Sequence, residues 1–366
     1  MGRGIPLLEW LEKVTFTHEA KFKDAEYAKR TYKSCVKGFL KQGITTASYY
    51  GSFHAEASKV LVDVCVEIGQ RALVGKCNMD RNAPDWCSDS PAGMSLDETR
   101  GFIEYVRQKQ HTSAGEGQLV TPVITPRFAI SCTEPLLEGL GEIAKQNPGL
   151  PIQTHFNEAR DEIEFTKSLF PNFKTETDLY EKYNLFTSRS ILAHSIFLQE
   201  HEIQRLREVN ASIAHCPISN TTMQEFMIAP IREYLRRGIK VGLGTDSGGG
   251  YSSSMLEVMK QAFLVSNARQ TITGGNDPAL SLEECFYLAT LGGAEVCGLG
   301  DQVGNFEVGK EFDALVINTD VEDGVMTPVE EDDSLYMILE KFLMTGDDRN
   351  IVKVYVNGKV VKNRME

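Results

Sequence analysis

An imidazole and a carboxylate stand three residues apart in the segment Pro151–Glu162, which reads PIQTHFNEARDE. The segment begins with an apolar run typical of a buried strand, and His155 is followed by Glu158. Residues i and i+3 of a strand point to opposite faces, so both side chains serve one site only if the strand ends near His155. A histidine at a strand end with a glutamate on the next loop suits a metal ligand beside a general acid/base. The alternative is a buried histidine next to a capping or surface glutamate.

Two further polar residues, His194 and Asp246, directly follow apolar runs of the same kind. Each has an ordinary explanation by itself, because such a histidine can be a satisfied core residue and such an aspartate can cap the next helix. Together with His155 they form a set of imidazole and carboxylate donors that suits zinc or iron, and zinc is the usual choice for hydrolysis. Glu158 would then be placed to take a proton from a water bound to the metal.

Strand-like and helix-like segments alternate along most of the chain, and seven strands are expected to start near residues 44, 72, 120, 152, 191, 212 and 241. Apolar strands that alternate with helices indicate a parallel sheet covered on both faces. A barrel builds its site from the ends of several strands, whereas an open sheet uses one switch point. The pattern therefore predicts an α/β fold, a TIM-type (β/α)8 barrel that here lacks its first strand. The polar residues at these strand ends are His54, Arg127, His155, Glu158, His194, His215 and Asp246.

Residues 301–366 are expected to form a small β element after a barrel domain that spans residues 1–300. Strands are predicted over Ala314–Ile317 and Val352–Val361, and the second run contains an Asn-Gly pair, which is a hairpin turn signal. Elsewhere, a serine followed three residues later by a glutamate predicts the start of a helix. These pairs are Ser95 with Glu98, before helix Leu96–Arg107, and Ser281 with Glu284, before helix Leu282–Cys297.

Composition narrows the class of protein. The 366 residues carry a net charge of −13, which argues against nucleic acid or an anionic membrane as the main partner. No apolar run reaches the roughly 18 residues of a membrane span. The eight cysteines are scattered without a C-x-x-C pair, so reduced thiols in the cytoplasm are expected rather than a disulfide framework.

One class of deaminase does not fit the motifs. Zinc deaminases of the His/Cys/Cys type carry H-x-E and P-C-x-x-C. Here the spacing is His155-x-x-Glu158, and Cys216 is followed by Pro217 without a second cysteine nearby. Any deaminase built on this sequence would therefore be of the barrel type.

The chain resembles the guanine deaminase family of the metal-dependent amidohydrolase superfamily over essentially all of its length. The His-x-x-Glu, Ala-His and Gly-Thr-Asp motifs mark the superfamily broadly, whereas the Pro-Arg-Phe run and the Leu-Leu-Glu-Trp-Leu helix are more specific. The matching segments are PLLEWL at 6–11, TPRF at 125–128, HFNE at 155–158, AH at 193–194, AHCP at 214–217, GTD at 244–246, ATLGGA at 289–294 and GKEFDA at 309–314.

This resemblance implies hydrolysis of guanine to xanthine and ammonia by a cytoplasmic homodimer that holds one Zn²⁺ per subunit. It implies that His155 and Asp246 are zinc ligands and that Glu158 is the proton shuttle. It further implies that His194 polarises the attacked carbon and holds the hydroxide, and that Asp246 helps to deprotonate the water. Arg127 and Phe128 would hold the purine. The chemistry agrees with the residues, since an arginine fork suits a guanine edge and a phenylalanine ring offers a stacking face, although a paired arginine and a core phenylalanine are the alternatives.

One departure from the family pattern is expected to matter. Family members carry a first strand that ends in His-x-His, which supplies two zinc ligands, and a substrate-binding glutamine follows. Here Met1 stands just before the helix that begins at Pro6, and His-x-His occurs nowhere. The sequence is thus expected to be a fragment, to have a mispredicted start, or to be a natural short form.

Two other functions therefore stay open beside guanine deamination. One is a short form without catalysis that acts by binding or by association with full-length subunits. The other is a related amidohydrolase that deaminates another amino-purine, a pterin or a triazine. His54 and His215 either take part in the pocket or merely shape it.

Overall fold

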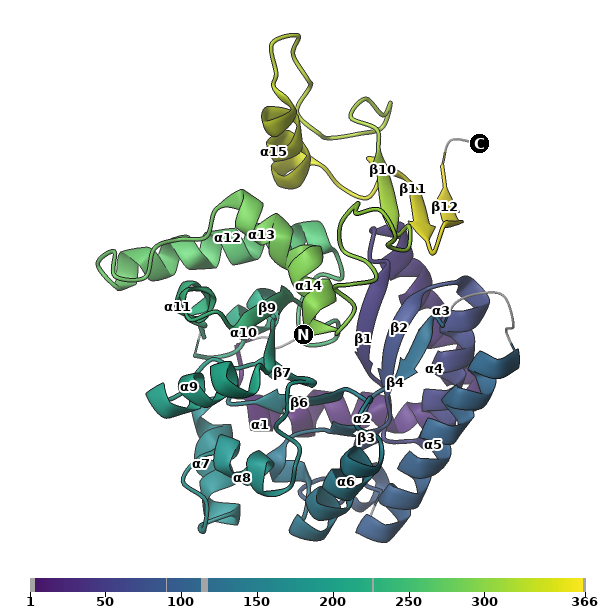
Figure 1. Cartoon of the computed structure of the whole chain (residues 1–366), viewed down its shortest axis with the longest axis vertical. Helices are drawn as coiled ribbons and strands as arrows, with labels where there is room; N and C mark the ends of the chain where they lie inside the picture. The colour runs from purple at the N-terminus through teal and green to yellow at the C-terminus, as the bar shows by residue number, and fades with distance from the viewer. Residues whose placement is uncertain (1–3, 90, 113–117, 226, 365–366) are drawn as a thin grey trace.

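Parallel strands form the centre of the molecule in the computed structural model, which describes residues 4–89, 91–112, 118–225 and 227–364 (Figure 1). Three strands make one sheet and four make a second, and all pairs within both sheets are parallel. The first sheet has the order β1 (Thr46–Tyr50), β2 (Arg71–Gly75), β4 (Val120–Pro122), and the second has the order β6 (Ile152–Phe156), β7 (Ser190–His194), β8 (Ser212–His215), β9 (Lys240–Leu243).

The two sheets are joined into one curved array. The short strands β3 (Cys77–Asn78) and β5 (Thr125–Pro126) pair just beyond β2 and β4, and a bridge connects Ile124 to Ile152 at the start of β6. The seven expected strands are therefore present in the expected order. Among the residues that the structure describes, no ladder joins β1 to β9, which leaves the array open between its first and last strands.

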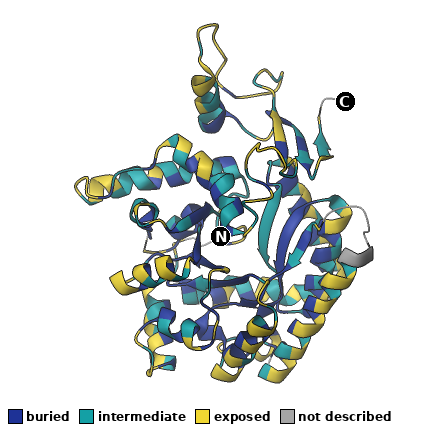
Figure 2. Ribbon diagram, in the orientation of Figure 1, coloured by how far each residue is buried: buried dark blue, intermediate teal, exposed yellow. Residues whose placement is uncertain are grey.

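Helices cover the outside of this array (Figure 1). Their apolar faces pack on the strands, and Figure 2 shows buried residues along the sheet and exposed residues on the outward helix faces. The helices that follow strands are α4 (Ala55–Ile68), α5 (Ala92–Thr112), α6 (Glu134–Gln146), α7 (Arg160–Leu169), α8 (Glu176–Lys182), α9 (Glu200–Val209), α10 (Pro217–Thr222), α11 (Ile231–Arg236) and α12 (Met255–Ile272).

The N-terminal helices contact the segments that follow the strands, because Glu19 bonds Arg127 after β5 and the N–H of Phe53 after β1. A nearly continuous helical segment with short π and 3₁₀ turns contains α1 (Leu7–Trp10) and α2 (Phe16–Glu19), and Leu7, Leu11 and Phe16 are buried in the core. Helix α3 (Ala25–Lys41) follows. The Asp24 side chain accepts hydrogen bonds from two backbone N–H groups of its first turn, which is a helix cap that the sequence analysis missed.

Two helix predictions need correction. Helix α5 begins at Ala92 rather than Leu96, so Ser95 lies inside it, and its hydroxyl is a partner of Lys76 and Asn78 instead of a capping group. The helix expected over Leu282–Cys297 is two helices, α13 (Leu282–Ala289) and α14 (Leu291–Val296), although its capping box at Ser281 is present.

The C-terminal residues form a separate antiparallel sheet of β10 (Ala314–Ile317), β11 (Ile351–Val356) and β12 (Lys359–Asn363), with α15 (Leu335–Thr345) between β10 and β11 in the chain. The hairpin turn has Asn357 at φ 48° and Gly358 at φ 73°, and a type I′ turn needs positive φ at both positions. Arg71 of β2 pairs with Asp313 and Glu311 and so ties this sheet to the barrel strands. Among the described residues, no helix combines the length and the apolar character that crossing a membrane requires.

Candidate active site

His155 lies at the carboxyl end of β6 with a fixed ring orientation. Its Nδ1 is 2.7 Å from the carbonyl oxygen of Arg127, so the Nδ1–H donates and Nε2 is left with a free lone pair. The ring packs 4.5 Å from the Tyr50 ring and 5.5 Å from the His194 ring, measured between centroids. Desolvation by this surrounding protein, aided by the neighbouring His194, lowers the pKa of His155 to about 3. A neutral imidazole whose other nitrogen is tied to a carbonyl is the form in which histidine binds metals.

Glu158 lies on the loop after β6, and its Oε2 is 3.5 Å from Nε2 of His194 at the end of β7. Both side chains are buried. Burial raises the pKa of the Glu158 carboxyl to about 7, and the opposing effect of His194 only partly offsets it. A carboxyl group with a pKa near neutrality can both accept and return a proton during turnover.

The His194 ring is oriented from its other side. Nδ1 is 2.8 Å from Oδ1 of Asn220 on α10, and because an amide oxygen can only accept, Nδ1 carries the proton and Nε2 faces Glu158. Burial by itself would lower the pKa of His194, but the carboxylates of Glu158 and Asp246 raise it overall. The two groups therefore form a pair that can share a proton across the site.

Asp246 stands three residues beyond the end of β9, on a tight turn. Its carbonyl oxygen accepts hydrogen bonds from the backbone N–H groups of Gly249 at 3.0 Å and Gly250 at 2.8 Å. A Cβ atom at position 249 would lie 2.6 Å from Oδ2 of Asp246, so a side chain there would displace the Asp246 carboxylate. The carboxylate is half-buried and close enough to raise the pKa of Glu158.

Left-handed backbone recurs at these strand ends. Asn157, His194, Ser195 and Asp246 have φ values of 46°, 71°, 49° and 45°. This region costs a non-glycine residue about 1–2 kcal/mol, and such residues cluster at functional sites where the surrounding structure holds them in place.

Arg127 and Phe128 follow β5 at the same end of the array. Nη1 of Arg127 is 2.5 Å from Oε2 of Glu19 and 3.4 Å from the sulfur of Met79, while its Nε has no hydrogen-bond partner among the described residues. Arg127 is therefore paired with Glu19 and buried, and its side chain is 9% exposed. Phe128 meets the His155 ring edge-on, with centroids 5.8 Å apart.

His54 and His215 differ in position. His215 ends β8 beside His194, its Nδ1 has no partner among the described residues, and burial lowers its pKa to about 3. His54 precedes α4 and stacks against Phe53 at 3.8 Å between ring centroids. Burial lowers the pKa of His54, and its charged neighbours are those around Glu19 rather than the residues around Glu158. The structure thus brings His215, but not His54, next to the Glu158–His194 pair.

Sequence reasoning missed Glu19 and Asn220, which orient Arg127 and His194. Glu19 gave no signal, because it lies 108 residues from its partner in a polar stretch of the N-terminal helices. Asn220 could have been noticed in the polar run that directly follows a strand end at His215.

The donors suit zinc in kind. His155 offers Nε2 with Nδ1 bound to a carbonyl, and Asp246 offers a carboxylate on the neighbouring turn. Within the described part of the chain, however, no three His, Cys, Asp or Glu side chains converge closely enough to hold a metal ion together. The residues present therefore fit a zinc site by chemistry and supply fewer ligands than a catalytic zinc usually has.

Comparison with known proteins agrees with this architecture. The profile described as "Amidohydrolase family" matches residues 1–361. The guanine deaminase of Mus musculus is 44% identical over 362 residues, which are 98% of this chain and 77% of the mouse protein. The solved guanine deaminase from C. acetobutylicum with bound guanine superposes with a TM-score of 0.89 at 36% identity. The match covers 98% of this chain and 82% of the C. acetobutylicum chain. An adenosine deaminase from Xanthomonas campestris with bound zinc, 22% identical with a TM-score of 0.81, shares the fold. The chain therefore belongs to the amidohydrolase family.

Proposed function

We propose that this chain carries the catalytic residues of a guanine deaminase, an enzyme that hydrolyses the C2–amino bond of guanine to give xanthine and ammonia. The observation that carries the proposal is the buried Glu158–His194 pair, 3.5 Å apart, at the same end of the strands as Arg127 and His155. The Mus musculus relative, which matches 98% of the chain at 44% identity, is a guanine deaminase, and the C. acetobutylicum guanine deaminase was solved with guanine bound.

Glu158 is assigned the proton transfers. In its ionised form the carboxylate takes a proton from the attacking water, and in its neutral form it returns a proton to the substrate so that ammonia can leave. The pKa of about 7 leaves both forms accessible near neutral pH. His194, oriented by Asn220, would polarise the attacked carbon and hold the attacking oxygen in place.

His155 and Asp246 are the residues that would hold zinc, and Asp246 would help to deprotonate the water. Zinc, when bound, supplies hydroxide from water at neutral pH. The role of His155 is supported by its free Nε2, since the bond from Nδ1 to the Arg127 carbonyl fixes the tautomer.

Arg127 and Phe128 are assigned the role of binding the purine ring. Guanine presents acceptors where adenine presents a donor, so a guanidinium selects guanine. Glu19 bonds Nη1 of Arg127, and Nε has no hydrogen-bond partner among the described residues, which supports a contact from Nε to the base. Phe128, edge-on to His155, would limit where the purine ring can lie.

Xanthine formation from guanine tests the proposal. The protein is assayed with zinc both as residues 1–366 and in an extended form, in which a first strand ending in His-x-His precedes residue 1. Adenine, a pterin and a triazine serve as alternative substrates, and Glu158→Gln serves as the matched control. Conversion of guanine by the extended form, lost in Glu158→Gln, is expected. A wild-type extended form that binds zinc and converts another heterocycle but not guanine would contradict the proposal.

Binding without turnover is the second candidate. It is favoured by the observation that no three metal-binding side chains converge among the described residues. If residues 1–366 bind guanine or associate with a full-length deaminase while producing no xanthine, this alternative holds for the chain as given.

The same proposal extends to organisation and location. We infer a catalytic unit over residues 1–300 and a small β unit over 301–366, a homodimer, and a cytoplasmic location. The separate antiparallel sheet supports the first point, and the eight unpaired cysteines support a reducing compartment. Limited proteolysis, analytical ultracentrifugation and cell fractionation test the three points.

A further inference from the structure

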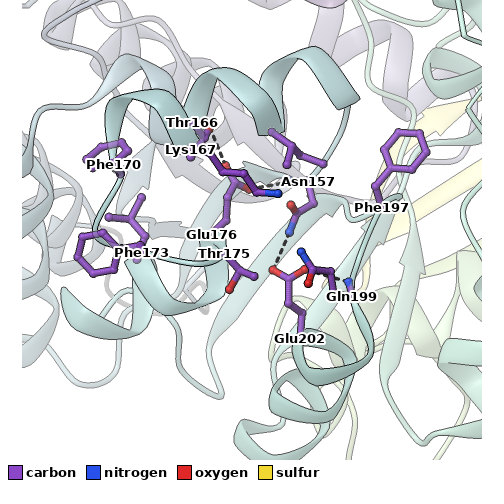
Figure 3. Close-up of a pocket in the computed structure, with 12 residues that line it drawn as sticks. Asn157, Thr166, Lys167, Phe170, Phe173, Thr175, Glu176, Phe197, Gln199 and Glu202 are labelled. Carbon is purple, nitrogen blue, oxygen red and sulfur yellow. Dashed lines mark hydrogen bonds between the residues drawn. The ribbon is translucent and has the colours of Figure 1, made fainter.

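A cluster of three buried glutamates contacts the loop after β6, which carries Glu158. Glu162 on α7, Glu176 at the start of α8 and Glu202 on α9 are each at most 2% exposed. Figure 3 shows Glu176 and Glu202 on either side of Asn157, in a pocket that Thr166, Phe170 and Phe197 also line. Buried carboxyl groups are rare unless they have a partner or a task, so the contacts of this cluster need an explanation.

The cluster forms hydrogen bonds with Asn157, the residue before Glu158. The N–H of Asn157 donates to Oε2 of Glu176 at 2.8 Å, and Nδ2 of Asn157 donates to Oε1 of Glu202 at 3.2 Å. The N–H of Glu158 itself donates to Oε2 of Glu162 at 3.3 Å. Two consecutive amides and one side chain are thus held by carboxylates from three helices. These contacts hold Asn157 in its left-handed conformation, with φ 46°.

The same residue also connects the loop to the His194 loop. The carbonyl of Asn157 accepts from the N–H groups of Ile196 at 3.0 Å and Phe197 at 3.2 Å, and the N–H of Ser195 donates to the carbonyl of Phe156 at 2.9 Å. The two loops that carry Glu158 and His194 are therefore bonded side by side. Their separation fixes the 3.5 Å contact between the two catalytic side chains.

Two of the glutamates lie close together. The hydroxyl of Thr166 lies 3.3 Å from Oε1 of Glu162 and 3.3 Å from Oε1 of Glu176. Burial raises the pKa of Glu162 to about 7 and that of Glu176 well above its usual range. Raised pKa values reduce the negative charge of the pair, so both side chains can accept the backbone N–H groups with less mutual repulsion.

We propose that Glu176, with Glu162 and Glu202, is a positioning residue for the reaction and acts by fixing the Asn157–Glu158 backbone so that Glu158 faces His194. This inference rests on the proposed function. The cluster bonds the backbone N–H groups of Asn157 and Glu158 and the Asn157 side chain, so we expect its effect on the reaction to pass through Glu158. Misplacement of a catalytic group by about 1 Å can cost on the order of 100-fold in rate.

Amide hydrogen exchange tests whether the glutamates hold the Asn157–Glu158 backbone, without any assay of activity. Glu176→Met keeps the side-chain volume and removes the acceptor, so the amides of Asn157 and Glu158 should exchange at least about 10-fold faster in peptides that cover them. Glu176→Gln keeps an acceptor oxygen and should restore most of the protection. Asp178→Ala weakens the capping box of the same helix without contacting Asn157 and should leave these amides unchanged. Asn157→Gly suits the positive φ, removes the Glu202 contact and gives a second variant if Glu176→Met does not fold.

Enzyme kinetics test whether the effect of Glu176 on the reaction passes through Glu158. They are measured in whichever form of the protein converts guanine. Glu176→Met should lower kcat by roughly 10- to 100-fold with KM changed less than about 3-fold, and Glu176→Gln should recover kcat. In a Glu158→Gln background the same substitution should cost less than about 2-fold, because its effect passes through the residue already removed. Unchanged exchange in both Glu176→Met and Asn157→Gly, or the same loss of kcat in both backgrounds, would overturn the inference. If no form converts guanine, the proposed function fails, and the exchange result alone decides on the positioning role.

Discussion

The ion pair between Glu19 and Arg127 offers a quantitative test of the substrate site. Nη1 of Arg127 lies 2.5 Å from Oε2 of Glu19, and the two side chains are 9% and 11% exposed. At this distance and an effective dielectric constant of about 20, the attraction is about 7 kcal/mol before the lost solvation of both groups is subtracted. Removing one partner of such a buried pair costs about 3–5 kcal/mol, because the other charge stays buried without compensation.

Glu19→Gln isolates the charge. The amide oxygen can still accept from the N–H of Phe53, which Glu19 contacts at 3.2 Å, so the shape of the site is kept. We expect the free energy of unfolding to fall by about 3 kcal/mol. We also expect KM for guanine to rise more than kcat falls, because Arg127 loses the partner that aims its fork. Glu9→Gln removes an exposed ion pair with Lys13 in the same helical segment and should leave both unchanged.

A double-mutant cycle separates this pair from general loosening. Urea unfolding and guanine kinetics are measured for Glu19→Gln, Arg127→Met and the double variant. Once Arg127 is gone, Glu19→Gln should cost less than about 0.5 kcal/mol in stability, since no charge is left unpaired. If Glu19→Gln is as stable as the wild type, or costs the same in both backgrounds, the ion pair does not hold Arg127 in the way described.

Four further results are expected. Glu158→Gln should keep zinc but lose about 10²- to 10⁴-fold in kcat of the extended form, and near-normal turnover would remove Glu158 from the mechanism. Arg127→Ala should cost roughly 1–3 kcal/mol in kcat/KM for guanine, with adenine still a poor substrate; equal rates on adenine would exclude guanine as the specific substrate. Burial raises the pKa of Glu162 to about 7 from 4.5, so the stability that its neutral form contributes is complete below pH 4.5 and is lost as pH rises to 7. Glu162→Gln should therefore lose less stability than the wild type between pH 5 and 8 in urea unfolding, by up to about 3 kcal/mol, and parallel pH curves would contradict this. Residues 1–366 by themselves supply His155 and Asp246, fewer than three ligands, so they should bind less than one zinc per chain and form no xanthine. The extended form should bind one zinc per chain and form xanthine. One zinc per chain with normal turnover in residues 1–366 would refute the ligand assignment.

Local pattern was enough to predict the strands and the residues at their ends. The strand β8 was predicted over the residues it occupies, and β6 ends one residue after His155, as the shared use of His155 and Glu158 required. Apolar runs between polar turns carry this information, because a parallel strand is buried on both faces. The hairpin turn at Asn357 was equally readable from its Asn-Gly pair.

Contacts between distant segments were beyond the reach of local pattern. Ser95 fits a capping box, yet its hydroxyl faces the buried Lys76 and Asn78, and α5 starts three residues earlier. The split between α13 and α14 has a similar cause. A Cβ atom at Gly242 of β9 would lie 2.8 Å from Cα of Gly293, so α14 approaches the strand closely, and Thr290 between the two helices has non-helical backbone angles. The Ser95 contact leaves no signal in the nearby sequence, and the glycines at 242 and 293 permit a close approach without identifying each other as partners.

The backbone of the site shows why its geometry could not be derived from residue types alone. A histidine and an aspartate in left-handed conformation, at His194 and Asp246, are unfavourable locally by about 1–2 kcal/mol each. Each is held by other parts of the chain, His194 through Asn220 and Asp246 through the N–H groups of Gly249 and Gly250. Such strain persists only where surrounding contacts fix the conformation. The side chains at these positions are therefore aimed by the whole fold, and the sequence near each residue tells which groups are present but not where they point.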